Sequence, residues 1–380
     1  MSALLGTSSG SPVGRAADLR VGSDPIPTLP TPMTRVTLAA CLAVLCALAA
    51  PTALAQSALW SDVSETSVTP SKARVTTPQA YRVVQLDEAQ MRDRLAGAPA
   101  ERRIGDTTPG AALTIPLPEG GLATVRVVES SILAPALQAR YPEIRTYLAS
   151  GSGVHGRLSL TPAGFQGLLF TTRCAVYVDA YAPGETEHYI VYRASDLIVA
   201  PALRGREADE VRRATRQAPT GPAARPNGET LRTYRLAVAA TGEYTQFHGG
   251  TKAAAMTAIT TTMNRVTGIY ERDFSVRFEL VANNDDVVFT NGTTDPYSNN
   301  NGFAMLSQNI ATLNALIGSG NFDVGHVFST GGGGVAYLGV ICSAQKAGGV
   351  TGRGAPVGDA FDVDYVAHEI GHQFGANHTF

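Results

Sequence analysis

Residues 368–378 read His-Glu-Ile-Gly-His-Gln-Phe-Gly-Ala-Asn-His. On a helix, His368 and His372 lie one turn apart on the same face, so both imidazoles can bind one metal ion. Gly375 stands where a left-handed residue can end the helix and reverse the chain, which lets His378 supply a third nitrogen. The pattern therefore predicts a zinc (Zn2+) site with three histidine ligands and a fourth position for water.

Glu369 is one step round the helix from His368, close enough to reach a metal-bound water without being a ligand. Zinc lowers the pKa of such a water toward neutrality, and a carboxylate can take its proton before the hydroxide attacks a carbonyl carbon. We therefore predict that Glu369 is the catalytic general base, which then returns the proton to the leaving amine.

The helix that carries this motif is expected to have Asp362 and Asp364 at its N-terminus, where acidic residues are favoured. Apolar residues recur at three- and four-residue spacing and are expected to form a buried stripe roughly opposite the ligands. They are Val363, Val366, Ile370 and Phe374.

His368-Glu369-x-x-His372-x-x-Gly375-x-x-His378 is the signature of the metzincin zinc peptidases, and the sequence resembles their reprolysin (adamalysin)-like family, M12B. Residues 334–342 and 347–350 look like the edge strand and following loop of that branch, and residues 348–380 are similar to its secreted bacterial members. The segments 141–144, 160–165 and 189–192 are similar to the N-terminal portion of these proteins.

This resemblance implies an α+β fold for the catalytic domain, with a mixed twisted sheet and long helices. It also implies a metalloendopeptidase that acts on proteins or peptides, with an extended substrate antiparallel to the edge strand near 335–340. An N-terminal propeptide would make the chain a zymogen.

One feature of the family is not expected in this sequence. Family members have a turn with a methionine below the ligands, downstream of the third histidine, and none of the six methionines follows position 305. The sequence therefore predicts an incomplete domain without its C-terminal subdomain. A truncated, non-catalytic exported protein that binds zinc or a partner is the alternative function.

Composition excludes several other classes of protein. The 380 residues are 44% hydrophobic and 16% charged, and 30 basic against 32 acidic side chains give a net charge of -2. Such a balance offers no large basic surface for a nucleic acid, and the hydrophobic content is too high for a wholly disordered chain. Apolar residues do not run on beyond one N-terminal segment, so a multispan membrane protein is not expected either.

That segment, residues 33–55, has the pattern of a secretory signal peptide: a basic residue at Arg35, an apolar core over 36–50 and Ala53-Leu54-Ala55 before the expected cleavage. We therefore expect secretion to the extracellular space or periplasm. A membrane anchor is disfavoured because the core is only about 15 residues long. A lipoprotein box at 38–41 is disfavoured because too few residues precede it. Residues 1–32 are expected to be a misassigned start or disordered.

The exported part is predicted to contain a propeptide-like region of mostly β structure (56–203), a linker (204–228) and the peptidase domain (229–380). Five arginines within 204–216, followed by three prolines within 217–228, fit either a processing site or a solvated charge run. Strands are expected at 122–128, 157–160, 165–170, 175–179 and 189–192, then at 231–239, 276–282 and 324–329. Helices are expected at 251–270 and 303–317, separated by an Asn-rich loop (283–301).

Two cysteines, Cys174 and Cys342, remain after signal cleavage. They could pair with each other. The resemblance implies instead that the partner of Cys342 lies in the absent C-terminal subdomain. Cys174 could also be a thiolate that caps the zinc, although its neighbours do not match the family's switch sequences. Three other histidines are expected to be packed or surface side chains and not ligands: His155, His188 and His326.

Overall fold

The computed structural model describes residues 58–102, 110–197 and 230–378. The predictions for residues 1–32, the signal peptide and the linker lie outside these ranges. Among the described residues, no helix has both the length and the apolar character needed to cross a membrane.

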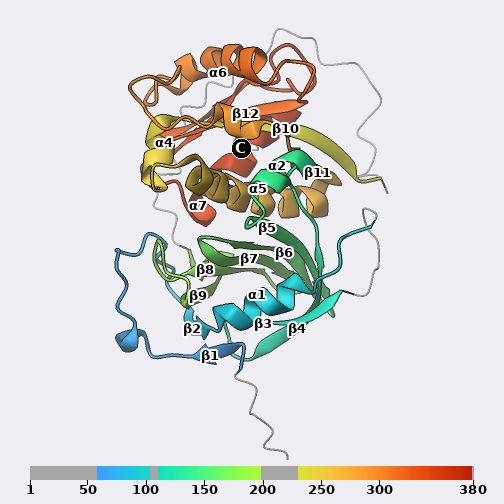
Figure 1. Ribbon diagram of the computed structural model, residues 1–380, viewed down its shortest axis with the longest axis vertical. Coiled ribbons are helices and arrows are strands. Elements are labelled where there is room, and N and C mark those ends of the chain that lie inside the picture. The colour runs from blue at the N-terminus through green and yellow to red at the C-terminus, as the bar shows by residue number, and fades with distance from the viewer. Residues whose placement is uncertain (1–57, 103–109, 198–229, 379–380) are drawn as a thin grey trace, which may run out of the picture. The chain divides into compact units, whose positions relative to one another are not determined.

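The first described region, residues 58–197, is built on a nine-stranded antiparallel sheet with the order β1-β2-β9-β8-β7-β6-β5-β4-β3 (Figure 1). We call it the β-rich region. Its strands are β1 (Trp60–Asp62), β2 (Arg82–Leu86), β3 (Ala111–Pro116), β4 (Leu122–Glu129), β5 (Arg145–Gly151), β6 (Val154–Thr161), β7 (Gly164–Thr171), β8 (Ala175–Ala180) and β9 (His188–Arg193).

Two helices accompany this sheet, α1 (Glu88–Ala96) and α2 (Pro135–Arg140). Met91 and Leu95 of α1 are buried in one core with side chains of β3 and β4. The five strands expected in this region are confirmed, whereas β1, β2, β3 and β5 were not anticipated.

The second region, residues 230–378, contains a five-stranded mixed sheet with the order β11-β10-β12-β14-β13. The strands are β10 (Arg232–Ala240), β11 (Val276–Leu280), β12 (Val324–Ser329), β13 (Gly333–Ala336) and β14 (Gly349–Gly352). Only the β13–β14 pair is antiparallel. The helices are α4 (Gly242–Phe247), α5 (Lys252–Phe274), α6 (Gly302–Leu316), α7 (Asp359–Phe361) and α8 (His368–Phe374). The expected α+β class, with helices packed on a mixed sheet, is confirmed.

Strand β10 shows why helices cover both faces of this sheet. Leu236 and Val238 belong to the core that contains α5, while the intervening Ala237 and Ala239 belong to the core that contains α6. Successive side chains on a strand point to opposite faces, so a strand that is apolar at consecutive positions requires cover on both sides.

Helix α5 is buried on more than one face. Thr251 caps its start by accepting a hydrogen bond from the amide of Ala254, and Ser275 ends it in the left-handed conformation. Met263 and Val266 pack toward the five-stranded sheet. Elsewhere on the helix, the Asn264 amide donates to the carbonyl of Leu158 in β6, at 2.9 Å.

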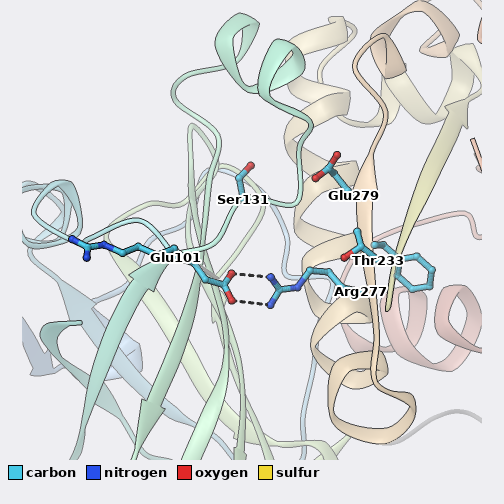
Figure 2. A pocket seen from close by; sticks show the side chains of 7 residues that line it. Glu101, Ser131, Thr233, Arg277 and Glu279 are labelled. Atoms are coloured by element: carbon cyan, nitrogen blue, oxygen red, sulfur yellow. Dashed lines mark hydrogen bonds and ion pairs between the residues drawn. The ribbon is translucent and has the colours of Figure 1, made fainter. Parts of the chain in front are cut away.

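The β-rich region and the second region also meet at a shallow pocket beside β11. The Arg277 guanidinium of β11 forms an ion pair with the Glu101 carboxylate there, with Nη1 2.8 Å from Oε2 (Figure 2). Ser131, Thr233 and Glu279 line the same pocket.

The helix that carries the metal motif does not begin at Asp362 and Asp364, as the sequence predicts. The chain becomes helical at Asp359, and residues Asp362–Ala367 form a π-helical segment before α8. Asp362 is buried and ion-paired with Arg265 of α5, so it does not cap an exposed helix end. A π turn is wider than an α turn and changes the directions of the side chains. Val366 and Ile370 belong to the core that contains α5, as expected. Val363 instead packs against the core of the β-rich region.

The edge strand and the Asn-rich loop also differ from the sequence prediction. The edge strand expected within 334–342 is shorter: β13 begins at Gly333 and ends at Ala336, and Gly339 then turns the chain with φ 65°. The Asn-rich stretch contains a short 3-10 helix, Asn284–Val287, and Val288 then bridges to Ala240.

Candidate metal centre

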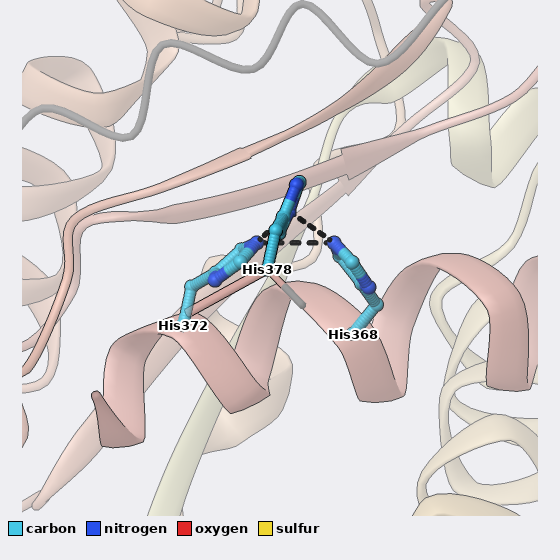
Figure 3. Close-up of side chains that lie close together, drawn as sticks. All are labelled: His368, His372 and His378. Carbon is cyan, nitrogen blue, oxygen red and sulfur yellow. Dashed lines mark hydrogen bonds between the residues drawn. The ribbon is translucent and has the colours of Figure 1, made fainter. Parts of the chain in front are cut away.

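The structure brings the three motif histidines together. The Nε2 atoms of His368 and His378 are 3.0 Å apart, those of His372 and His368 are 3.0 Å apart, and those of His372 and His378 are 2.8 Å apart (Figure 3). His368 and His372 project from α8, and Gly375, with φ 100°, reverses the chain so that His378 reaches the same point. In the described part of the chain this is the only cluster of three or more potential ligands.

The hydrogen bonding of His372 leaves its Nε2 lone pair directed at the other two rings. Its Nδ1 is 2.7 Å from the carbonyl oxygen of Ala376, which can only accept, so Nδ1 carries the hydrogen. With the hydrogen on Nδ1, Nε2 is the nitrogen that can act as a metal ligand. Such an arrangement is the usual one for a metal-binding histidine, whose other nitrogen is held by a backbone carbonyl.

The size of this cluster fits a metal ion such as zinc. Nitrogen ligands about 2.0–2.1 Å from a tetrahedral zinc are roughly 3.3 Å from one another, slightly more than the observed separations. His372 is buried, while His368 and His378 are partly exposed, so one side of the cluster is accessible. Three imidazoles are a donor set typical of zinc and other first-row transition metals.

The Glu369 carboxylate lies against the edge strand. Glu369 is 3% exposed. A Cβ added to Gly334 of β13 would come closer than 3.0 Å to Oε1, Cδ and Cγ of Glu369, a separation that real Cβ atoms essentially never show. Glycine at position 334 therefore makes room for the carboxylate beside the strand.

The comparisons with known proteins bear on this region of the chain. Residues 230–380 match the model of the Reprolysin_4 family, described as "Metallo-peptidase family M12B Reprolysin-like". By this match, the segment is similar to M12B reprolysin-like metallopeptidase domains.

Among solved structures, the chain is similar to metalloproteinase-II from Bacteroides fragilis, with 11% identity and a TM-score of 0.36, over 68% of this chain and 79% of that chain. A comparison with curated proteins gives no match.

A buried network behind α8 of the reprolysin-like domain was not anticipated from the sequence. The Gln373 amide donates to the carbonyls of Gly325 (2.8 Å) and Lys346 (3.1 Å), which leaves its Oε1 to accept from His326 Nδ1 at 2.9 Å. His326 Nε2 must then accept from the Thr351 hydroxyl at 2.8 Å. The network joins the helix of the metal ligands to strands β12 and β14.

His326 is thus a packed side chain and not a member of the cluster, as expected. It is fully buried, and burial lowers its pKa to about 4, so the ring is neutral near pH 7. The sequence offered no signal for its pairing with Gln373, because the two residues are 47 positions apart and only the packing of α8 on the sheet brings them together.

The last carbonyls of α8 hold the loop that follows β13 in the reprolysin-like domain. The amide of Gly339 donates to the carbonyl of His372, and the amide of Val340 donates to that of Gln373, both at 2.9 Å. Helix C-terminal carbonyls lack partners within the helix, so these bonds satisfy them and fix the edge strand to the metal-binding helix.

The two cysteines do not bridge in the structure. Both are free, so the pairing of Cys174 with Cys342 is not observed. Cys174 packs against the core of the nine-stranded sheet, with Sγ 3.9 Å from the Thr171 hydroxyl, and it is not among the clustered ligands. The partner that the resemblance implies for Cys342 stays a prediction.

Proposed function

We propose that the reprolysin-like domain is a zinc-dependent endopeptidase in which His368, His372 and His378 hold the metal and Glu369 is the general base. The observation that carries the proposal is the convergence of three Nε2 atoms within 3.0 Å, on and just beyond the helix that bears a buried glutamate. When bound, zinc supplies a Lewis acid that activates water and polarises a carbonyl group.

Glu369 has the chemistry for both proton transfers of peptide hydrolysis. Its carboxylate accepts a proton from the attacking water and passes it to the nitrogen of the leaving amine. The close approach of Gly334 restricts where this carboxylate can lie. Restricting a catalytic group in this way lowers the entropy lost on reaching the transition state.

Strand β13 provides a place for an extended protein substrate. It is the last strand of its sheet, and within the described residues β14 is its only strand partner. A peptide in extended conformation can add to such an edge through backbone hydrogen bonds. Because the loop after β13 is bound to α8, a peptide on this strand would lie close to Glu369.

We further propose that the protein is exported as a precursor. The support is the signal-peptide pattern at residues 33–55 and the β-rich region that precedes the peptidase domain. The residues that follow the signal peptide would then enter an extracytoplasmic compartment with the propeptide-like region still attached.

The decisive experiment compares Glu369→Gln with the wild-type chain and with Glu143→Gln, a control at an exposed glutamate. We expect Glu369→Gln to bind one zinc ion per chain but to cleave a fluorescent casein about 10²–10⁴-fold more slowly, while the control is unchanged. His372→Ala should lose the zinc. Full hydrolysis by Glu369→Gln would contradict the role of the base, and a wild-type chain that binds no zinc would contradict the metal site.

A further inference from the structure

The β-rich region occupies one edge of the peptidase sheet. Its segment around Leu133 forms a parallel bridge with Leu280 of β11. The amide of Leu280 donates to the carbonyl of Ile132 at 2.7 Å, and the amide of Ala134 donates to the carbonyl of Leu280 at 2.9 Å. An uncovered edge strand would present unpaired backbone groups. This contact therefore satisfies the backbone amide and carbonyl of Leu280 at the edge opposite to β13.

The two regions also share one hydrophobic core. Ile132, Leu133, Leu137 and Ile144 of the β-rich region are each at most 3% exposed and belong to the same core as the apolar face of α5. Burial of apolar side chains is the main favourable term in association. Separation of the regions would expose these four side chains and the part of α5 and β11 that they cover.

A first ionic network crosses the same interface. Arg157 of β6 is fully buried and binds Glu271 of α5 with two bonds, Nη2 to Oε1 at 2.6 Å and Nε to Oε2 at 2.9 Å. Arg277 of β11 bonds to Glu271 as well and continues to Glu101. Burial alone would raise the pKa of Glu271, but the two guanidiniums hold it below its ordinary value.

Each region contributes one cation and one anion to this network. Arg157 and Glu101 come from the β-rich region, whereas Glu271 and Arg277 come from the peptidase domain. If the regions separated, Arg157 and Glu101 would lose their ion-pair partners, whereas Glu271 and Arg277 would still pair with each other. Removal of one partner from a buried ion pair is strongly unfavourable.

A second network reaches the segment that leads to the metal helix. Arg265 of α5 pairs with Asp179 of β8 and with Asp362, whose Oδ2 is 2.9 Å from Nη1. The Tyr192 hydroxyl donates to Asp179 at 2.5 Å, and the Tyr177 hydroxyl donates to Asp359. The β-rich region thus binds α7 directly through Tyr177 and is linked through Arg265 to Asp362 of the π-helical segment before His368.

From these contacts we infer that the β-rich region is a lasting noncovalent subunit of the peptidase domain, and that it stays bound after the connection between residues 198 and 229 is cut. The shared apolar core resembles that of permanent interfaces, and separation would leave buried charges without their partners. This role is independent of the proposed peptidase activity, because it concerns association and not catalysis.

The test uses the full chain, with the recognition sequence of a site-specific protease placed within residues 204–228. The folded protein is cut and then examined by size-exclusion chromatography with light scattering, in low salt and in 1 M NaCl. We expect both fragments to elute together at the mass of the uncut chain in both buffers, because buried pairs are screened little. Two separate peaks in the low-salt buffer would overturn the inference.

A pair of arginine variants tests the buried charges. In Arg157→Met the network loses its fully buried cation, whereas the control Arg145→Met removes a half-exposed pair with Glu129 inside the β-rich region. After cutting, we expect the fragments of Arg157→Met to bind each other roughly 100-fold more weakly than those of the control. Equal affinities would contradict the role of the network. Should Arg157→Met fail to fold, Asp179→Asn replaces it in the same measurement.

Discussion

Gly334 of the edge strand and Glu369 of the metal helix are in such close contact that a Cβ on Gly334 would overlap the Glu369 carboxylate. A methyl group there can be accommodated only if the carboxylate moves. We therefore expect Gly334→Ala to lower peptide cleavage by about 10²-fold, because small displacements of a catalytic group have effects of that size. Cleavage of fluorescent casein and zinc content by mass spectrometry check this, and the zinc content should be unchanged.

The matched control is Gly332→Ala, two residues earlier, where an added Cβ has no heavy atom within 4 Å. It should retain wild-type activity. An equal loss in both variants would mean that flexibility of the glycine-rich turn is responsible, and not the contact with Glu369.

The metal motif could be predicted because its geometry is local. His368 and His372 are one turn apart on a single helix, and Gly375 permits the reversal that brings in His378, so the sequence spacing alone determines their proximity. Strand β10 and helix α5 could be predicted for the same reason, since their apolar periodicity is set by the faces that they bury.

Other features depend on partners far away in the chain. Asp362 has the local pattern of a helix N-terminus, but its position is decided by Arg265, 97 residues earlier. Strand β5 has a pairing partner on each side, and no local turn signal indicates its register with β4. Such contacts arise from tertiary packing, which single-sequence patterns do not contain.

Gln373 should be important for stability. In Gln373→Leu the carbonyl of Gly325 loses its side-chain donor and His326 loses its acceptor, whereas the carbonyl of Lys346 still accepts from the amide of Gly325. Each unsatisfied buried group costs about 1–3 kcal/mol, so we expect the free energy of unfolding to fall by roughly 3 kcal/mol or more. Urea denaturation measures this, with the exposed Gln345→Leu as a control that should stay near wild type. A small effect, similar to the control, would show that the network contributes little.

Gly349→Ala tests the same network by adding a methyl group at a backbone position that contacts it. An added Cβ would come closer than 3.0 Å to both Gln373 Oε1 and His326 Nδ1, the two atoms of one hydrogen bond. We expect Gly349→Ala to lower the free energy of unfolding about as much as Gln373→Leu does. The double variant should lose less than the sum of the two single losses, because both changes break the same interaction. Additive losses would indicate separate causes.

His326 should make stability depend on pH. Burial lowers its folded pKa to about 4 from 6.5, so below pH 6.5 the unfolded chain takes up a proton that the folded chain does not. The stability from this group is complete above pH 6.5 and is lost as the pH falls toward 4, by about 3 kcal/mol in total. We expect His326→Gln to lack this part of the pH dependence in urea denaturation between pH 4.5 and 8. The exposed His155→Gln variant should retain it, and parallel curves for wild type and His326→Gln would contradict the assignment.

Asp359 should have the opposite pH dependence. Burial raises its pKa to about 7 from 3.8, and the neighbouring Asp364 carboxylate adds to the effect, although the hydrogen bond from Tyr177 opposes it. The folded chain then holds a proton that the unfolded chain has lost, so stability from this group declines as the pH rises from 3.8 to 7.

Asparagine at position 359 keeps an oxygen for the Tyr177 hydroxyl and carries no charge. We therefore expect Asp359→Asn to gain stability relative to wild type as the pH rises from 4 to 8, by roughly 4 kcal/mol in total, while the exposed Asp286→Asn gains nothing. Urea denaturation at several pH values gives both curves. A difference between Asp359→Asn and wild type that does not change with pH would mean that Asp359 is ionised in the folded protein throughout this range.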